Sequence, residues 1–158
     1  MDRKTLFFLA IGSLFIAGVF GYKDYLARNQ LYFVIEMKTF AKGTAQIFFD
    51  TGRGIIEQDS SSLQVRGLGY HKYSFPVPTP IKSIRFDPIN VTSVISIKYA
   101  AIENATGEKL KIFPIQSFRA VQQINKMDVK EGVLTIQTVE NANDPFLEKS
   151  NESIDNAY

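Results

Sequence analysis

The stretch that decides the fold is residues 31–54, LYFVIEMKTFAKGTAQIFFDTGRG. Its two ends, residues 31–38 and 45–50, are rich in aromatic and β-branched side chains, which are favoured in β-strands. Residues 51–54 form a glycine-rich turn signal. The stretch has no sustained periodicity of 3.6 residues, which a helix would need. We therefore predict that the folded domain begins with two β-strands.

Short β-prone runs and turn residues alternate through the rest of the chain. Within residues 91–102, positions 94, 96 and 98 are expected on one face and positions 95, 97 and 99 on the other, as in a strand with one buried face. Prolines 76, 78, 80 and 88 are expected at strand ends, because proline cannot donate to a central ladder. Further strands are predicted at residues 63–66, 70–75, 81–86, 109–113, 118–124, 127–129 and 133–139, with turns at 104–107 and 130–132. About eight to ten short strands favour an all-β fold, a jelly-roll-like antiparallel β-sandwich.

Composition narrows the possible functions. The 158 residues include 13 Phe and 7 Tyr, enough apolar material for the core of one domain. There is no cysteine, which excludes disulfides, thiolate nucleophiles and Cys-ligated zinc. His71 is the single histidine, so most histidine-based metal sites and catalytic triads lack their residues. Without these residues most familiar catalytic chemistries are absent, so we expect the protein not to be an enzyme. The net charge is only +2, so we also expect no nucleic-acid partner.

Residues 5–22, TLFFLAIGSLFIAGVFGY, contain no charged side chain. As a helix this run is about 27 Å long, close to the thickness of the hydrocarbon core of a bilayer. Tyr22 and Tyr25 follow where interfacial aromatic residues are expected. The sequence thus predicts one N-terminal transmembrane helix with the lipid bilayer as its partner.

Two fates of this segment stay open, a retained signal anchor and a cleaved signal peptide. The anchor is favoured, because Val19 and Phe20 interrupt the small residues that a cleavage site requires. Basic residues at both ends give a small excess at the N-terminus, which places the following domain outside the cytoplasmic membrane, in the periplasm or at the cell surface. The predicted organisation is an anchor with a short linker at 1–30, a β-sandwich at 31–148 and a flexible polar tail at 149–158.

Three segments carry a resemblance to a known family: residues 46–60 (QIFFDTGRGIIEQDS), 73–78 (YSFPVP) and 84–88 (IRFDP). Across about residues 31–147 the chain resembles the extracytoplasmic β-sandwich domain, similar to galactose-binding and carbohydrate-binding modules, of bacterial membrane proteins that synthesise surface polysaccharides. The resemblance implies a cell-envelope setting and no catalytic residues. This chain departs from that architecture because it has one predicted anchor and no glycosyltransferase region. A membrane glycosyltransferase would therefore be a separate partner.

Four acidic residues lie near glycine and proline turns: Asp50, Glu57, Asp59 and Asp87. Loops of jelly rolls can supply such oxygen ligands to a structural calcium ion, so these residues are the metal candidates, and no other cofactor is expected. The alternative, which we favour, is that Asp50 and Asp87 organise turns by accepting bonds from nearby backbone N–H groups. Glu57 and Asp59 could also serve a glycosidase, but two residues apart on one strand they lack the opposed geometry that this reaction requires.

The ligand-binding candidates are Tyr70, His71, Tyr73 and Arg85. Aromatic rings beside polar groups are typical of sugar sites. Alternation places Tyr70 and Lys72 on one face of a strand and His71 and Tyr73 on the other, so at most one of these pairs belongs to a site. His71 is favoured as an ordinary surface residue. Arg85 is expected either to fork to a carboxylate, Asp50 or Asp87, or to contact an anionic sugar.

These observations predict a membrane-anchored accessory module that binds a cell-envelope glycan or a protein of polysaccharide assembly. Two alternatives remain. One is an envelope hydrolase or esterase, which would need converging carboxylates or an activated serine in a pocket. The other is a structural envelope protein that assembles with itself.

Overall fold

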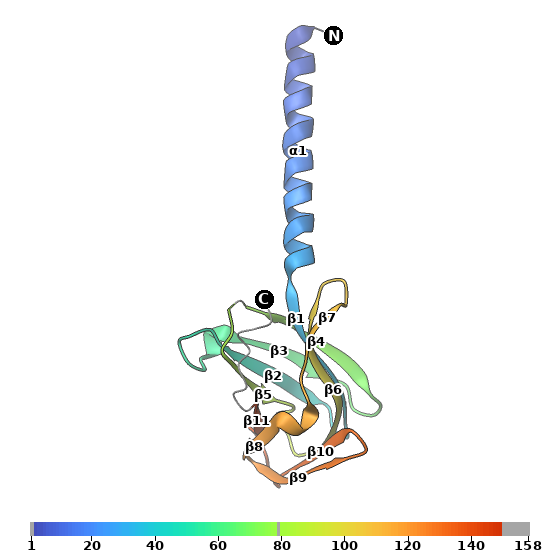
Figure 1. Cartoon of the computed structure of the whole chain (residues 1–158), viewed down its shortest axis with the longest axis vertical. Coiled ribbons are helices and arrows are strands. Elements are labelled where there is room, and N and C mark those ends of the chain that lie inside the picture. Colours follow the sequence, from blue (N-terminus) through green and yellow to red (C-terminus); the bar gives the residue numbers. More distant parts are fainter. Residues whose placement is uncertain (1, 79, 150–158) are drawn as a thin grey trace.

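The computed structural model describes residues 2–78 and 80–149, and for residues 3–11, 24 and 26–28 it describes the backbone alone. A long helix, α1 (Arg3–Asn29), leads directly into a β-domain and projects away from it (Figure 1). The helix continues to Asn29, so the short linker that we expected before residue 31 is largely helical. The chain reaches the first strand within two residues of the last helical turn, so the helix and the sandwich are joined closely.

The β-domain consists of two antiparallel sheets, which confirms the predicted β-sandwich class. Sheet A has the strand order β4-β1-β6-β10-β9, with β7 also paired to β6, and sheet B has the order β3-β2-β5-β11-β8. The strands of sheet A are β1 (Leu31–Thr39), β4 (His71–Val77), β6 (Val94–Asn104), β7 (Lys109–Ile112), β9 (Ile124–Lys130) and β10 (Val133–Thr138). Those of sheet B are β2 (Gly43–Asp50), β3 (Ser60–Val65), β5 (Ser83–Asp87), β8 (Phe118–Gln122) and β11 (Phe146–Lys149).

Most connections cross from one sheet to the other. Only the hairpins β2–β3, β6–β7 and β9–β10 keep consecutive strands in the same sheet. The turn between β9 and β10 consists of Glu131 and Gly132, with φ of 51° and 75°. Two successive positive φ angles are those of the type I′ turn, whose twist matches that of the flanking strands.

The core lies between the inner faces of the two sheets and is rich in phenylalanine. The ring of Phe33 on β1 lies 6.0 Å from that of Phe86 on β5 and 5.8 Å from that of Phe113. Phe75 on β4 contacts Phe86 edge to face at 6.1 Å. Tilted and edge-on arrangements are those that aromatic rings prefer, and burial of such large side chains supplies most of the driving force for folding.

The strand β6 departs from the predicted alternation. Its pairing with β1 shifts between Glu36 and Met37, so that Glu36 lies opposite Tyr99 and Met37 opposite Ile97, with Lys98 as the additional residue. A bulge of this kind re-aims the side chains beyond it. Tyr99 is therefore on the outer face of sheet A instead of sharing the face of Ile95 and Ile97.

Three further expectations were wrong in detail. Pro76 lies within β4 and not at its end; β4 is an edge strand, where a missing N–H is tolerated. Glu57 and Asp59 belong to a short 3-10 helix, η1 (Glu57–Asp59), and not to a strand. The strand β11 was not predicted, and it includes the buried Lys149, which we had assigned to the polar tail. The rest of that predicted tail, residues 150–158, lies outside the described residues. A second 3-10 helix, η2 (Ile115–Ser117), precedes β8.

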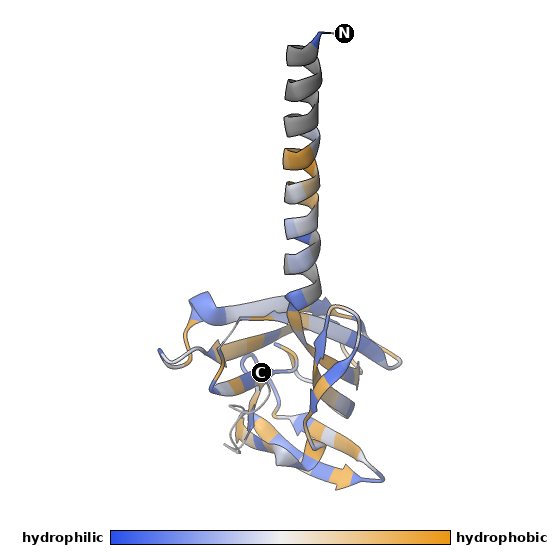
Figure 2. Cartoon of the chain, turned by 45° about the horizontal axis from the view of Figure 1, so that its top comes forward, coloured by the Kyte–Doolittle hydropathy of each residue, from blue (hydrophilic) through white to orange (hydrophobic). Residues whose placement is uncertain are grey.

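The middle of α1 presents large apolar side chains to solvent. Leu14 is 74% exposed, Phe15 72% and Phe20 68%. Figure 2 shows a hydrophobic band part-way along the helix, well away from the sandwich. Among the residues that the structure describes, no helix combines the length and the hydropathy needed to cross a membrane. The side chains of residues 3–11, which include the first seven residues of the apolar run, lie outside the described part.

Candidate ligand-binding surface

The outer face of sheet A carries two tyrosines that each have lysine ammonium groups over the ring. At Tyr70, just before β4, Nζ of Lys98 lies 3.8 Å and Nζ of Lys38 5.5 Å from the ring centroid. At Tyr99 on β6, Nζ of Lys109 lies 5.1 Å and Nζ of Lys72 5.6 Å from the centroid. These six residues are called the tyrosine–lysine face below.

The four lysines of this face are not neutralised by ion pairs. The salt bridges found among the described residues involve Arg53 and Arg85 and none of these lysines. A cation over an aromatic ring is attracted by the negative face of the ring, which orients the ammonium group without neutralising its charge. The face therefore presents cations that are held in position and can still bind an anion.

Two carboxylates lie on the same side of the sheet. Glu36 is opposite both Lys72 and Tyr99 in the strand register. Glu103 is buried and accepts a hydrogen bond of 2.7 Å from the Tyr99 hydroxyl. Burial and the neighbouring Glu103 raise the pKa of Tyr99 well above its ordinary value. The Tyr99 hydroxyl is thus a hydrogen-bond donor whose partner is Glu103.

A shallow pocket adjoins the tyrosine–lysine face at the end of the sheet nearest α1. It has a volume of about 280 Å³. Its walls come from β1, β4 and the β6–β7 hairpin, and the lining residues are Tyr32, Val34, Ser74, Glu103, Asn104, Ala105 and Gly107. The Asn104 side chain shapes the hairpin, because its Oδ1 accepts bonds from the backbone N–H groups of Thr106 and Glu108, both at 3.0 Å.

The candidates Tyr70, His71 and Tyr73 divide as alternation predicts. Tyr70 lies on the tyrosine–lysine face. Tyr73 is buried, and its hydroxyl accepts a hydrogen bond of 2.9 Å from the backbone N–H of Arg66. His71 lies 3.2 Å from the carbonyl oxygen of Leu68 through Nε2 and packs edge-on against Tyr73. His71 and Tyr73 therefore hold the loop before β4 and are not part of the same surface as Tyr70.

Arg85 lies on the outer face of sheet B, on the opposite side of the molecule from the tyrosine–lysine face. It forks to Asp87 through Nε and Nη2, at 2.9 and 2.7 Å, and Nη2 also contacts Asp144 at 2.7 Å. The guanidinium lies 3.8 Å from the ring centroid of Phe146 and 4.9 Å from that of Phe48. Of the two expected roles, this geometry matches the fork to a carboxylate, with Asp87 as the partner.

Burial and the ion pairs act in opposite directions on the two central groups of this cluster. Burial raises the pKa of Asp87 to about 6, against the opposing hydrogen bond and charge of Arg85. Burial also disfavours the charged form of Arg85, but the hydrogen bonds and charges of Asp87 and Asp144 together outweigh it and raise the pKa of Arg85. A polar pocket of about 160 Å³ lies beside Asp87 and Asp144. Because Arg85 already has two carboxylate partners, it is not a free cation for a ligand.

The remaining acidic candidates are each bound by protein donors. Asp50 accepts bonds from the backbone N–H groups of Gly52 and Gly54, at 2.7 and 2.9 Å, as the turn-forming alternative predicted. The Asp59 carboxylate binds Arg53 and the Thr51 hydroxyl, both at 2.7 Å. The hydrogen bond from Thr51 is the main cause of the lowered pKa of Asp59; burial opposes it and Arg53 adds to it.

Glu57 accepts a bond of 2.7 Å from the side chain of Gln46. Within the described residues, no group of three or more acidic or histidine side chains is placed to hold a metal ion. The structure therefore does not bring Asp50, Glu57, Asp59 and Asp87 together as one calcium site.

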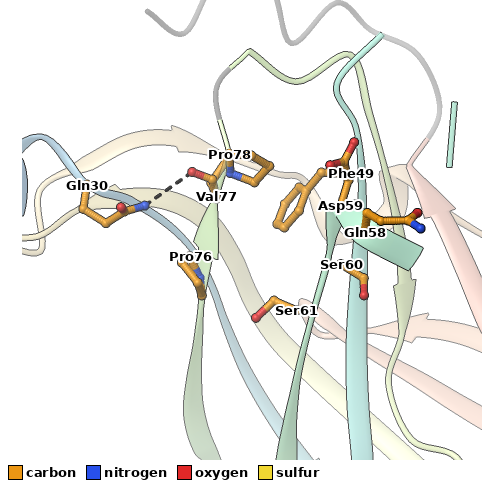
Figure 3. A pocket seen from close by; sticks show the side chains of 9 residues that line it. All are labelled: Gln30, Phe49, Gln58, Asp59, Ser60, Ser61, Pro76, Val77 and Pro78. Carbon is orange, nitrogen blue, oxygen red and sulfur yellow. Dashed lines mark hydrogen bonds between the residues drawn. The ribbon is translucent and has the colours of Figure 1, made fainter. Parts of the chain in front are cut away.

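A further pocket, of about 330 Å³, lies beside the junction between α1 and the sandwich (Figure 3). Its walls combine Phe49, Pro76 and Pro78 with Ser60 and Ser61. Gln30 lies on one side, and its Nε2 contacts the carbonyl oxygen of Val77 at 3.4 Å. Asp59 also lines this pocket, but it is already bound to Arg53 and Thr51, so the pocket has no free charge of its own among these groups.

Sequence reasoning placed Lys72 on the same strand face as Tyr70, but it missed Tyr99 and the other three lysines that surround the two rings. The spacing of Lys38, Lys72 and Lys98 contains no motif, because these residues meet only through the pairing of β1 with β4 and β6. A partial signal existed in the strands themselves. Every lysine that lies in a strand belongs to sheet A, in β1, β4, β6, β7 and β9, except Lys149. Lys149 lies in β11 of sheet B, and the other four strands of sheet B contain no lysine.

Searches against protein-family models, curated proteins and solved structures found no match to this chain.

Proposed function

We propose that this chain is a membrane-tethered, non-enzymatic binding module that displays its β-sandwich outside the cytoplasmic membrane and binds a cell-envelope glycan. The observation that carries the proposal is the tyrosine–lysine face, an open sheet surface on which polar groups and aromatic rings are held in fixed positions. The crossing pattern of the two sheets also supports the jelly-roll-like architecture expected of such modules.

The proposed tether rests on α1. Residues 5–22 form one uncharged apolar run, and the side chains described within it are exposed rather than packed on the sandwich. Exposure of such an apolar surface to water is unfavourable, and soluble proteins therefore rarely have contiguous apolar patches of this extent. Insertion into a bilayer would remove it from water, and the tether would raise the local concentration of the module at the membrane.

The proposed binding surface is suited to recognition and not to bond cleavage. The tyrosine–lysine face supplies ammonium donors on an open sheet, and the adjoining pocket adds the amide of Asn104 and the hydroxyl of Ser74. Hydroxyl-rich ligands are recognised by such donors and acceptors placed beside aromatic walls. We further propose that the protein partner of this module at the membrane is a glycosyltransferase that produces the glycan.

The tether is tested by expressing the full chain in a bacterium and extracting the membranes with alkaline carbonate. We expect the chain to stay in the membrane pellet and its C-terminal end to be cleaved by protease added to spheroplasts. A double substitution, Leu14→Glu with Phe15→Glu, places two charges in the exposed apolar band and should release the chain. Recovery of the unchanged chain in the carbonate supernatant would refute the tether.

The binding function is tested with the full chain in a neutral detergent on an array of envelope glycans. We expect binding to a subset of glycans that is weakened by Tyr99→Ala. The absence of binding to every glycan would refute this function. In that event, capture of a membrane glycosyltransferase by the tethered chain would support the alternative of a protein partner in polysaccharide assembly.

A further inference from the structure

We infer that the ligand of the tyrosine–lysine face is an anionic polysaccharide, a glycan that carries carboxylate or other acidic groups along its length. This inference rests on the proposed function and names the chemical class of its ligand. Nothing in the overall net charge of +2 indicates such a ligand. It follows from the way in which the fold separates the charges.

The outer face of sheet A carries a local excess of positive charge. On the outer face of sheet A, the four lysines of the tyrosine–lysine face stand against two carboxylates, Glu36 and Glu103, so that the local charge is 4 − 2 = +2. The neighbouring edge strand β9 adds Lys126 and Lys130 against Asp128. A local excess of one sign raises the concentration of oppositely charged ligands at that surface.

The tyrosine rings serve this face by orienting the lysines. With Nζ of Lys98 only 3.8 Å from the centroid of Tyr70, one side of that ring is occupied by an ammonium group. A sugar ring cannot stack on the same side. The ammonium groups keep N–H donors directed away from the rings, and an ammonium group binds acidic oxygens more strongly than neutral hydroxyls because the hydrogen bond is charge-assisted. The arrangement therefore favours acidic sugars over neutral ones.

The two tyrosines form two separate cationic positions, which fits a polymer better than a single small anion. In β1, Lys38 belongs to the cluster at Tyr70, whereas Glu36, two residues earlier, lies opposite Tyr99 of the other cluster. Two residues along a strand correspond to about 7 Å. Acidic groups that repeat along a glycan could occupy both positions at once, and the second contact would then form at high effective concentration.

The test uses the full chain in a neutral detergent and the probe polygalacturonate, a polymer of acidic sugars. Its fully methyl-esterified form is the matched neutral ligand, because it has the same sugar backbone without the charge. We expect polygalacturonate to bind measurably at low salt, the ester to bind at least about tenfold more weakly, and the acidic polymer to be released as salt screens the lysines.

Two double variants remove the cations, Lys38→Gln with Lys98→Gln and Lys72→Gln with Lys109→Gln. Each should weaken polygalacturonate binding by about tenfold, which corresponds to two exposed charge contacts. The matched control is Lys82→Gln with Arg119→Gln, which removes two positive charges outside the strands of sheet A and should change binding by less than about twofold. Unchanged circular dichroism spectra would show that all three variants are folded.

The possible results separate the inference from the proposed function. Loss of binding in the two face variants, with the control unaffected, supports the inference. Equal loss in the control, or equally tight binding of inorganic polyphosphate or a DNA 20-mer, overturns it, because the surface would then be a general polyanion surface. Equal binding of the methyl ester overturns the anionic class but leaves glycan binding in place. If the chain binds neither polymer and no acidic glycan on the array, the inference is refuted. The proposed function is refuted only if the chain also binds no neutral glycan.

Discussion

The substitution Arg85→Gln should destabilise the sandwich, and should do so more at alkaline than at acidic pH. Arg85 forks to Asp87 on the outer face of sheet B, and their side chains are only 20% and 11% exposed. Removal of one partner of a buried pair costs about 3–5 kcal/mol, because the other charge is left buried and unpaired. Since the pair keeps some access to water and Asp144 is half-exposed, we expect a loss of about 2–3 kcal/mol at pH 8.

The pH dependence follows from the raised pKa of Asp87. Its value of about 6 in the folded protein lies above the ordinary 3.8, so the protonated carboxyl is favoured by folding. The stability that Asp87 contributes is therefore present below about pH 4 and is lost as the pH rises through about 6. Without Arg85 the pKa of Asp87 rises further, because a favourable charge has been removed. Near pH 4 the carboxyl is neutral with or without Arg85, and the loss should fall to about 1 kcal/mol, that of the contacts with Phe48 and Phe146.

The free energy of unfolding can be measured by urea denaturation of the full chain in a neutral detergent, followed by circular dichroism, since the chain has no tryptophan. Adding Asp87→Asn to Arg85→Gln should recover at least about 1 kcal/mol at pH 8. The control is Arg119→Gln, an exposed arginine of β8, which should change stability by less than about 0.5 kcal/mol. A loss that is the same at pH 4 and pH 8, or a double variant that recovers nothing, would show that the buried charge of Asp87 is not the cause.

Three other substitutions test parts of the fold by the same unfolding measurement. Gly43→Ala would place a Cβ atom 2.7 Å from Cγ1 of the buried Ile89, and should cost about 1–3 kcal/mol through overpacking; a neutral result would contradict this close approach. Glu131→Asn replaces a non-glycine residue at a φ of 51° with one that adopts this region more readily, so we expect a gain of a few tenths of a kcal/mol, and a loss would argue against the type I′ turn. Tyr73→Phe removes the acceptor of the backbone N–H of Arg66 and should cost about 1 kcal/mol, together with faster hydrogen exchange at that amide; unchanged exchange would exclude this bond.

The sandwich was predictable because strands and turns can be recognised from the pattern of neighbouring residues in the sequence. The buried Ile35 and Met37 alternate with Glu36 and Lys38 in β1, and the turn at Glu131 and Gly132 has the short form that joins two antiparallel strands. The strand β11 was missed because its four residues, FLEK, form too short a run to show a period. Its hydrogen bonds to β5 and β8 stabilise it, and both of these strands lie far from it in the sequence.

The candidate site was predictable only for Tyr70 and Lys72, which the alternation of one strand places on the same face. Tyr99 was assigned to the wrong face, because a bulge forms from the pairing of two strands and leaves no mark in the alternation of either one. For Arg85 the sequence left Asp50 and Asp87 open as partners, and the structure selects Asp87, which lies two residues away on the same side of the sheet. The third member, Asp144, lies 59 positions from Arg85 and could not be assigned without the fold.

By itself, the sequence determined the properties that depend on neighbouring residues: the apolar run of residues 5–22, the all-β character of the domain, the lack of cysteine and the turn-forming role of Asp50. The tertiary structure alone decided which side chains share a surface. Strand pairing brings Lys38, Lys72 and Lys98 to two tyrosine rings and leaves sheet B almost without strand lysines. The physical reason is that side-chain direction along one strand follows from local geometry, whereas the neighbours across a sheet follow from the register of strands that are distant in the chain.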